Sequence, residues 1–314
     1  MRIFVTGGAG NIGQYVSLAA AENGHEVVVL SRTPEKYTGL SDLNPRISFV
    51  QGFIHEYDKI AKYLEGCDAV LHIALGWGNE PVTMCMEDTV PTVNLLEMSE
   101  RLGVEKFIYT SSTAVLGRYE LYMDESLAVS PTALYGSTKA ASEAYVLGFR
   151  EYGSEHGTIG EQVEMKRNII RPGYTFSNPP YPGASSQHDR RFRDITDAIV
   201  HNYPIQLVAK DGTQFLSAGQ LAKVYLALLD TDLNEEIFYA VGSDYITWER
   251  IAEIALEEYP ESRATIELYD KGYGLPMMFS IKKMKENFGL EFPGEDEVRA
   301  HVKWNLEQSL KNAK

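Results

Sequence analysis

The sequence predicts an α/β fold with a doubly wound parallel sheet and a smaller region toward the C-terminus. Up to Pro172, short apolar runs rich in Val and Ile alternate with amphipathic helical patterns. Runs that lack polar alternation are typical of strands that helices cover on both faces of a parallel sheet. A glycine-rich turn directly follows the first run. These observations together indicate a Rossmann-type arrangement.

The expected strands are the apolar runs at residues 3–5, 27–30, 47–50, 69–73, 107–110, 168–171 and 237–241. The expected helices are the patterns at residues 11–23, 93–102, 192–201, 220–229, 248–258, 281–287 and 295–310. Ser130 and Pro131 have the form of a helix cap followed by a proline in the first turn. Residues 177–189, rich in Pro, Ser and Gly, are expected to form a loop.

The change of pattern after Pro172 predicts two regions. We expect residues 1–172 and 213–243 to form the dinucleotide-binding domain. Residues 173–212 and 244–314 are expected to form a smaller substrate-binding region that closes over the carboxyl edge of the sheet.

Charge and composition exclude several kinds of partner. The chain carries 29 basic and 44 acidic residues, a formal net charge of −15, and such a surface repels nucleic acid and anionic membranes. The N-terminal residues already form a strand pattern, and no apolar run approaches the roughly 20 residues of a membrane helix. Two cysteines without metal-type spacing fit a reducing compartment. We therefore expect a cytoplasmic protein that binds a small molecule, with no bound metal.

The glycine-rich turn predicts a dinucleotide site. Residues 6–13 read TGGAGNIG and lie between the first strand and the first helix. Glycines at such positions permit a tight turn and let the backbone approach a pyrophosphate, which the helix N-terminus then binds. The candidate cofactor residues of this turn are Gly7, Gly10, Asn11, Ile12 and Gly13.

The end of the second strand bears on which dinucleotide binds. Ser31 and Arg32 stand where a carboxylate would hold the ribose hydroxyls of NAD. An arginine can bind the 2′-phosphate of NADP instead, so the sequence favours NADP and leaves NAD possible. The alternative is that Arg32 simply faces solvent.

Tyr135 and Lys139 are candidate catalytic residues. Their spacing of four places them on one face of a helix. A nearby ammonium favours the phenolate and is expected to lower the pKa of Tyr135, which suits proton exchange with a substrate hydroxyl or carbonyl. Ser112, just beyond a central strand, can hydrogen-bond the same substrate oxygen. The alternative for Tyr135 and Lys139 is that they lie on an exposed helix face without a catalytic role. The alternative for Ser112 is that it belongs to a serine-rich turn.

As an ordered set, these motifs resemble the extended short-chain dehydrogenase/reductases of the NAD(P)-dependent epimerase/dehydratase family. The matching segments are residues 6–13, 72–74, 94–97, 107–112, 135–143, 171–173 and 281–290. The resemblance implies that Tyr135 is the acid/base, that Lys139 lowers its pKa and binds the nicotinamide ribose, and that Ser112 is the family's catalytic hydroxyl. It also adds Ala74 to the cofactor residues. Members are commonly homodimers joined by two helices, here residues 93–102 and 134–151.

Departures from the family pattern bear on the substrate. Phe53 replaces a usual carboxylate, Asp88 replaces a usual Asn, and the segment around Phe215 lacks an Arg that contacts a sugar nucleotide's diphosphate. Arg190, Arg191 and Arg193, which lie beside the loop at residues 177–189, could contact the diphosphate in place of the missing Arg. The absence of carboxylates beside Ser112 argues against 4,6-dehydration. The sequence leaves three candidate functions open. Two are enzymatic, namely epimerisation of a sugar-like substrate and net reduction of a ketone. The third is dinucleotide sensing without catalysis.

Overall fold

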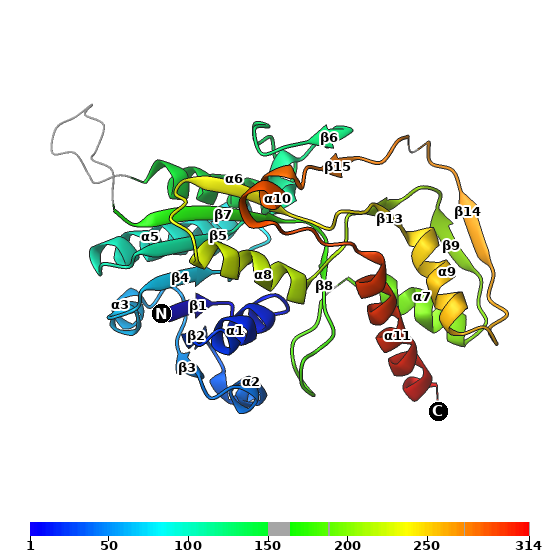
Figure 1. Ribbon diagram of the computed structural model, residues 1–314, viewed down its shortest axis with the longest axis horizontal. Helices are drawn as coiled ribbons and strands as arrows, with labels where there is room; N and C mark the ends of the chain where they lie inside the picture. The colour runs from blue at the N-terminus through cyan, green and yellow to red at the C-terminus, as the bar shows by residue number, and fades with distance from the viewer. Residues whose placement is uncertain (150–163, 188, 273, 314) are drawn as a thin grey trace.

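The computed structural model describes residues 1–149, 164–187, 189–272 and 274–313 (Figure 1). The last two residues of the helix expected at 134–151 lie outside these ranges. A central sheet with helices on both faces makes up one side of the molecule, and a smaller group of helices and strands lies beside it.

The central sheet has seven parallel strands in the order β12-β7-β5-β4-β1-β2-β3. The strands are β1 (Arg2–Thr6), β2 (Glu26–Ser31), β3 (Ile47–Gln51), β4 (Ala69–His72), β5 (Lys106–Thr110), β7 (Lys166–Pro172) and β12 (Glu236–Ala240). The doubly wound sheet and all seven expected strands are therefore confirmed. The strand order reverses between β1 and β4, and such a reversal opens a crevice at the carboxyl ends of the strands.

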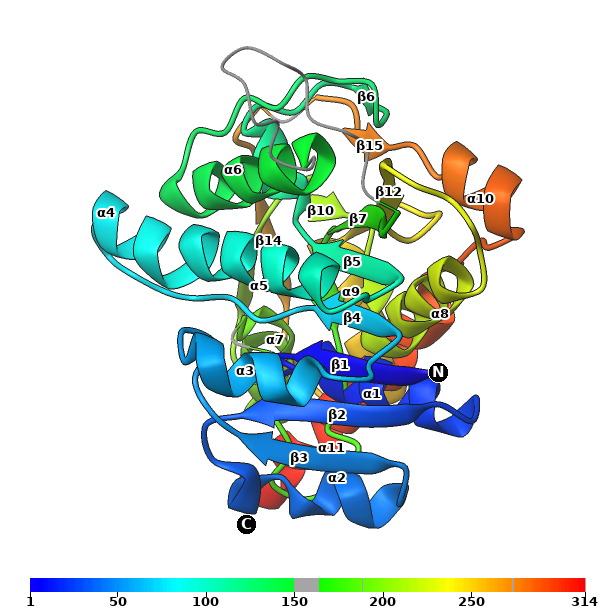
Figure 2. The same cartoon turned by 90° about the vertical axis from the view of Figure 1, so that its left-hand side faces the viewer.

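Helices cover both sides of this sheet (Figures 1 and 2). The helix faces turned to the sheet are apolar. One face packs against α1 (Gly13–Glu22), α2 (Thr38–Leu43), α8 (Ala218–Leu229) and α10 (Lys282–Phe288). The other packs against α3 (Tyr57–Leu64), α5 (Val90–Arg101) and α6 (Leu134–Gly148). Two buried clusters result, one on each face, as the continuous apolar strand runs predict.

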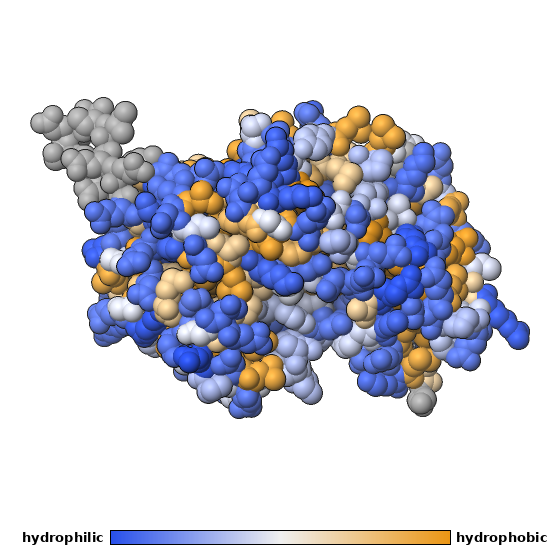
Figure 3. All heavy atoms as spheres, in the orientation of Figure 1, coloured by the Kyte–Doolittle hydropathy of each residue, from blue (hydrophilic) through white to orange (hydrophobic). Residues whose placement is uncertain are grey.

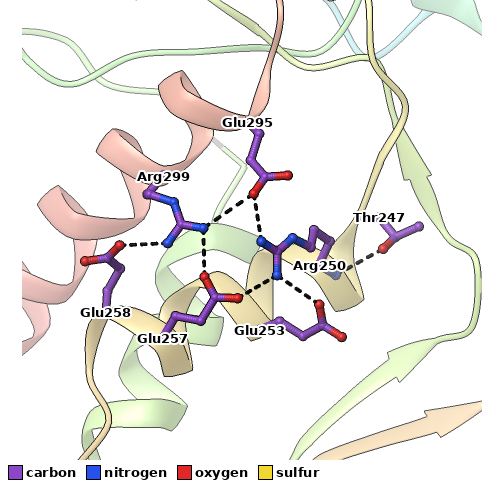
Figure 4. A network of polar contacts seen from close by, with 7 residues as sticks. All are labelled: Thr247, Arg250, Glu253, Glu257, Glu258, Glu295 and Arg299. Atoms are coloured by element: carbon purple, nitrogen blue, oxygen red, sulfur yellow. Dashed lines mark hydrogen bonds and ion pairs between the residues drawn. The ribbon is translucent and has the colours of Figure 1, made fainter.

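The smaller group has its own core. Its helices are α7 (Arg191–Val200), α9 (Trp248–Glu258) and α11 (Glu295–Asn312), packed with β9 (Ile205–Val208) and β14 (Ile266–Tyr269). Phe192, Phe215 and Trp248 meet edge to face in this core, with ring centroids 5.1–5.6 Å apart. Arg250 and Glu257 of α9 join Glu295 and Arg299 of α11 in a partly exposed ion-pair network (Figure 4).

The remaining described elements are short. They are α4 (Pro81–Met84), a π turn (Cys85–Thr89), two 3₁₀ turns (Pro34–Lys36 and Thr113–Leu116), and the strand pairs β6 (Tyr122–Met123) with β15 (Met278–Phe279), β8 (Thr175–Phe176) with β11 (Leu216–Ser217), and β10 (Gly212–Thr213) with β13 (Ile246–Thr247). Hydrophilic residues dominate the face shown in Figure 3, as the charge composition predicts.

Two details differ from the sequence-based expectations. The helix that carries Tyr135 begins at Leu134 with Ala133 as its N-cap, so Ser130 and Pro131 do not start it. Instead, the Ser130 N–H donates to the carbonyl of Val115. In addition, α10 packs on the sheet through buried Met284, although it lies in the segment expected to bind substrate. The division into two functional regions stays a prediction.

Candidate active site

The glycine turn requires residues without side chains. Gly7 has a left-handed φ of +71°, and a Cβ on it would lie 2.6 Å from the backbone nitrogen of Ala74. A Cβ on Gly13 would lie 2.1 Å from the carbonyl oxygen of Gly7. The Gly10 N–H closes the turn by donating to that same carbonyl at 2.9 Å. The turn therefore brings the N-terminus of α1, whose N-cap residue makes no side-chain capping hydrogen bond, to the carboxyl edge of the sheet.

A cleft of about 450 Å³ opens at this edge. Its lining brings together five of the predicted cofactor residues, namely Gly7, Gly10, Ser31, Arg32 and Ala74. Asn11, Ile12 and Gly13 lie beside it, at the start of α1, and the Asn11 side chain accepts a hydrogen bond from the Ser177 hydroxyl. A glycine-lined cleft at a helix N-terminus and a strand-order reversal fits a dinucleotide.

The outer end of the cleft is cationic and aromatic. Arg32 is exposed there, and its guanidinium has no ion-pair partner among the described residues. Phe53 and His55 also line this end, with their rings stacked 5.4 Å apart. From the sequence, Phe53 was predicted only to remove a carboxylate contact to the adenine. The signal that identifies both rings is their position just after β3, which pairs with β2, the strand that ends beside Arg32.

Asp88 and His72, which sequence reasoning did not assign to the site, line the inner end of the cleft. Both lie among residues that the family resemblance marks, but neither spacing nor charge pattern singles them out. The Asp88 carboxylate accepts a hydrogen bond from the Gly76 N–H at 3.0 Å. The same carboxylate lies 3.7 Å from the Lys139 ammonium, and both side chains are buried. The ion pair thus joins the cleft to the helix that carries Tyr135.

Tyr135 and Ser112 come together through α6 and the 3₁₀ turn after β5, where a side-chain hydrogen bond with Ser112 lowers the pKa of Tyr135. Burial has a larger effect, and the charge of Asp88 adds to it, so the pKa of Tyr135 is raised. The lowering expected from Lys139 is therefore not found, because burial, and after it the charge of Asp88, raises the pKa of Tyr135. Lys139 is buried with its ammonium 5.0 Å from the centre of the Tyr109 ring. Burial lowers the pKa of Lys139, and Asp88 partly offsets this.

The three arginines considered for substrate binding are all engaged by carboxylates. Arg191 forms a close ion pair with Asp189 at 2.6 Å and lies 4.1 Å from the centre of the Trp248 ring. Arg190 and Arg193 form looser pairs with the acidic residues four positions later, Asp194 and Asp197. A diphosphate would have to compete with these carboxylates.

Two further findings concern metals and membranes. Across the described ranges, no three His, Cys, Asp or Glu side chains are grouped so as to hold a metal ion. None of the helices described combines the length and the apolar character that crossing a membrane requires.

The fold and the cleft define a dinucleotide-binding α/β protein with a Tyr-Lys pair on the helix beside its cleft. The model of the NAD dependent epimerase/dehydratase family matches residues 3–242. The chain belongs to this family of extended short-chain dehydrogenase/reductase enzymes.

Relatives with different named activities match the chain. The dTDP-D-glucose 4,6-dehydratase of Mus musculus is 32% identical over 260 residues, which is 78% of this chain and 68% of that protein. The 3 beta-hydroxysteroid dehydrogenase/Delta 5→4-isomerase of Mycobacterium tuberculosis is 32% identical over 190 residues, 56% of this chain and 48% of that protein. The chain thus spans about half the length of the steroid enzyme.

Solved structures share the fold along the whole chain. The UDP-glucuronic acid 4-epimerase of Bacillus cereus, in complex with NAD, superposes with a TM-score of 0.79 at 21% identity and 100% coverage of both chains. At this identity the match establishes the fold alone.

Proposed function

We propose that the protein catalyses reversible, NAD(P)-dependent hydride transfer at a secondary alcohol or ketone carbon of a sugar-like substrate. The observation that carries this proposal is the buried Asp88–Lys139 pair, which links the glycine-lined cleft to the helix of Tyr135. A cofactor in the cleft and a substrate oxygen at the phenol would then lie close to each other. The sugar-like class rests on the relatives and structures named for sugar nucleotides.

In this proposal, Tyr135 is the acid/base and exchanges a proton with the substrate oxygen. Ser112 hydrogen-bonds the same oxygen and orients it against the phenol. Lys139 holds the nicotinamide ribose and supplies positive charge near the phenol. The bound dinucleotide supplies the hydride acceptor or donor, as is general for nicotinamide cofactors.

The dinucleotide is proposed to be held by Gly7, Gly10, Asn11, Ile12 and Gly13 at its pyrophosphate. Ser31 and Arg32 are proposed to read the adenosine ribose, and Ala74 to lie near the nicotinamide half. The guanidinium of Arg32, which is exposed and has no ion-pair partner in the part of the chain that the structure describes, favours the 2′-phosphate of NADP. The Bacillus cereus structure contains NAD, so NAD is the alternative.

A second candidate function is net reduction of a non-sugar ketone by NADPH. The carboxylate-paired arginines 190, 191 and 193 favour it, because a sugar nucleotide's diphosphate needs free cations. Dinucleotide sensing without turnover is the third candidate. We further propose that the protein is cytoplasmic, as its composition favours, and that it forms a homodimer through α5 and α6, as the family resemblance implies.

The cofactor retained after purification separates these candidates. Mass spectrometry should find tightly held oxidised dinucleotide in a self-regenerating epimerase and an empty site in a reductase. UDP-glucose and UDP-glucuronic acid, followed by chromatography for the 4-epimers, then test epimerisation directly. Tyr135→Phe should abolish turnover, whereas Tyr203→Phe, at a tyrosine that is 61% exposed outside the cleft, should not. Unchanged turnover in Tyr135→Phe would contradict the proposal.

A further inference from the structure

Asp88 and Lys139 form an ion pair that is withdrawn from solvent. The side chain of Asp88 is 1% exposed and that of Lys139 is 3% exposed. A buried ion pair persists only when further hydrogen bonds satisfy its charges. Asp88 meets this condition, because the Gly76 N–H donates to one carboxylate oxygen at 3.0 Å and the Thr138 hydroxyl donates to the other at 3.3 Å.

The backbone around Asp88 is fixed on both sides. Asp88 lies in the π turn that precedes α5, and such widened turns occur frequently at functional sites. On one side, a Cβ on Gly76 would lie 1.7 Å from the carbonyl oxygen of Glu87, so the loop after β4 packs directly on the turn. On the other side, the hydroxyls of Thr89 and Thr138 lie 2.7 Å apart and join the turn to α6. The carboxylate therefore has little freedom to move away from Lys139.

We propose that Asp88 is a positioning residue that holds the Lys139 ammonium and sets how readily the phenol of Tyr135 releases its proton. This inference rests on the proposed function, in which Tyr135 is the acid/base. Asp88 does so in two ways. Its negative charge acts directly on the phenol, and its pairing cancels part of the positive charge that Lys139 would otherwise present to Tyr135.

Among the charged groups near Tyr135, Asp88 is the carboxylate whose negative charge affects the pKa of the phenol. The titratable and charged residues near the phenol or its lysine are Asp88, Lys139, Tyr109, His72, Glu143 and Arg171. Glu143 is already paired with Arg171 at 2.7 Å, so its charge is compensated. Burial keeps His72 neutral, with a pKa of about 3, and holds the pKa of Tyr109 well above its usual range.

Two substitutions should shift the pKa of Tyr135 in opposite directions. Asp88→Asn keeps the shape of the side chain, removes the negative charge and frees Lys139, so the pKa of Tyr135 should fall by about one unit or more. Lys139→Met leaves Asp88 without its partner, so Tyr135 should stay protonated at every pH at which the fold persists. In the double variant the two effects should largely cancel.

Tyrosine labelled with ¹³C at Cζ reports these shifts without any turnover. The Tyr135 resonance is identified among the 19 tyrosines by its loss in Tyr135→Phe and followed from pH 8 upward, with circular dichroism to monitor folding. Glu87→Gln is the matched control, because Glu87 is an exposed carboxylate next to Asp88 and should leave the titration unchanged. If Asp88→Asn alone does not fold, the comparison of the double variant with Lys139→Met carries the test, because these two proteins differ only at Asp88.

The inference would be overturned if the pKa of Tyr135 did not change in the folded variants. It would also be overturned if Asp88→Asn and Lys139→Met shifted that pKa in the same direction. Its failure is distinguishable from failure of the proposed function. Shifts as expected without turnover of any sugar nucleotide would contradict only the substrate class, whereas loss of turnover in Tyr135→Phe with unmoved titrations would contradict only the role of Asp88.

Discussion

The Nδ1 atom of His72 lies 2.6 Å from the hydroxyl oxygen of Thr6, so the ends of the adjacent strands β4 and β1 are joined by a side-chain hydrogen bond. On its other side, Nε2 lies 2.8 Å from the hydroxyl of Thr92 on α5. The ring is fully buried, and burial together with the charge of Lys139 lowers its pKa to about 3. The imidazole therefore acts as a neutral connection between the sheet and α5.

The buried His72 should make the protein less stable in acid. Between pH 6.5, the usual pKa in an unfolded chain, and pH 3, the unfolded state binds a proton that the folded state does not. The free energy of unfolding should fall as the pH falls through this window, by about 2 kcal/mol from His72 between pH 7 and pH 5. His301, whose pKa burial lowers to about 4, should add in the same direction.

Urea unfolding at pH 7 and pH 5 measures this effect. His72→Gln should reduce the difference in stability between the two pH values, whereas the same substitution at the exposed His55 should not. An equal pH dependence in wild type and His72→Gln would refute the linkage to this residue.

Much of the fold follows from the sequence because the strands of the central sheet are buried on both faces. Their continuous apolar runs give a signal that does not depend on partners distant in the chain. The two-residue strands β6 and β15 gave no such signal, since each exists only because the other, more than 150 residues away, pairs with it. The predicted start of the helix that carries Tyr135 was wrong. The Ser130 N–H donates to the carbonyl of Val115, and the local sequence does not reveal this hydrogen bond.

Gly10 offers a substitution that separates dinucleotide binding from folding. A Cβ on Gly10 would meet only the carbonyl oxygen of Gly7, at 3.2 Å, so Gly10→Ala should fold with a nearly unchanged Tm. Because Gly10 lines the cleft, the methyl group should weaken dinucleotide binding more than tenfold, which corresponds to about 1.4 kcal/mol. Calorimetric titration with NADP and NAD measures the loss. Gly148→Ala is the control, since its Cβ would have no atom of the described residues within 4 Å. Wild-type affinity in Gly10→Ala would contradict a phosphate-binding role for the turn.

Arg32 should decide the preference between the two dinucleotides. Arg32→Asp replaces a cation by a carboxylate that repels a 2′-phosphate, and charge-assisted hydrogen bonds contribute about 1.5–3 kcal/mol. We expect the affinity for NADP to fall at least tenfold relative to that for NAD. Lys36→Asp makes the same charge change at an exposed residue that does not line the cleft, and it should leave the ratio unchanged. Equal affinity ratios in wild type and Arg32→Asp would show that Arg32 faces solvent in the complex.

The candidate site was less accessible to sequence reasoning than the fold. Spacing identifies Tyr135 and Lys139 as neighbours on a helix, but it cannot show that Lys139 is paired with Asp88, some 50 positions earlier. Whether the pKa of Tyr135 is raised or lowered depends on burial and on the charge of that distant carboxylate, and both are properties of the folded chain.

The buried pair of Arg171 and Glu143 should contribute more to stability than an exposed pair of similar length. The Arg171 guanidinium donates to both carboxylate oxygens of Glu143, at 2.8 and 2.7 Å, and both side chains are at most 4% exposed. Glu143→Gln leaves a buried guanidinium without its counter-charge, which should lower the free energy of unfolding by about 3–5 kcal/mol. Glu26→Gln breaks an ion pair with Arg46 that is also 2.8 Å long but 49–61% exposed, and it should change stability by about 1 kcal/mol or less. Urea unfolding of the two variants and the wild type at pH 7 compares them directly. Similar losses in both variants would mean that burial does not govern the contribution of Glu143 to stability.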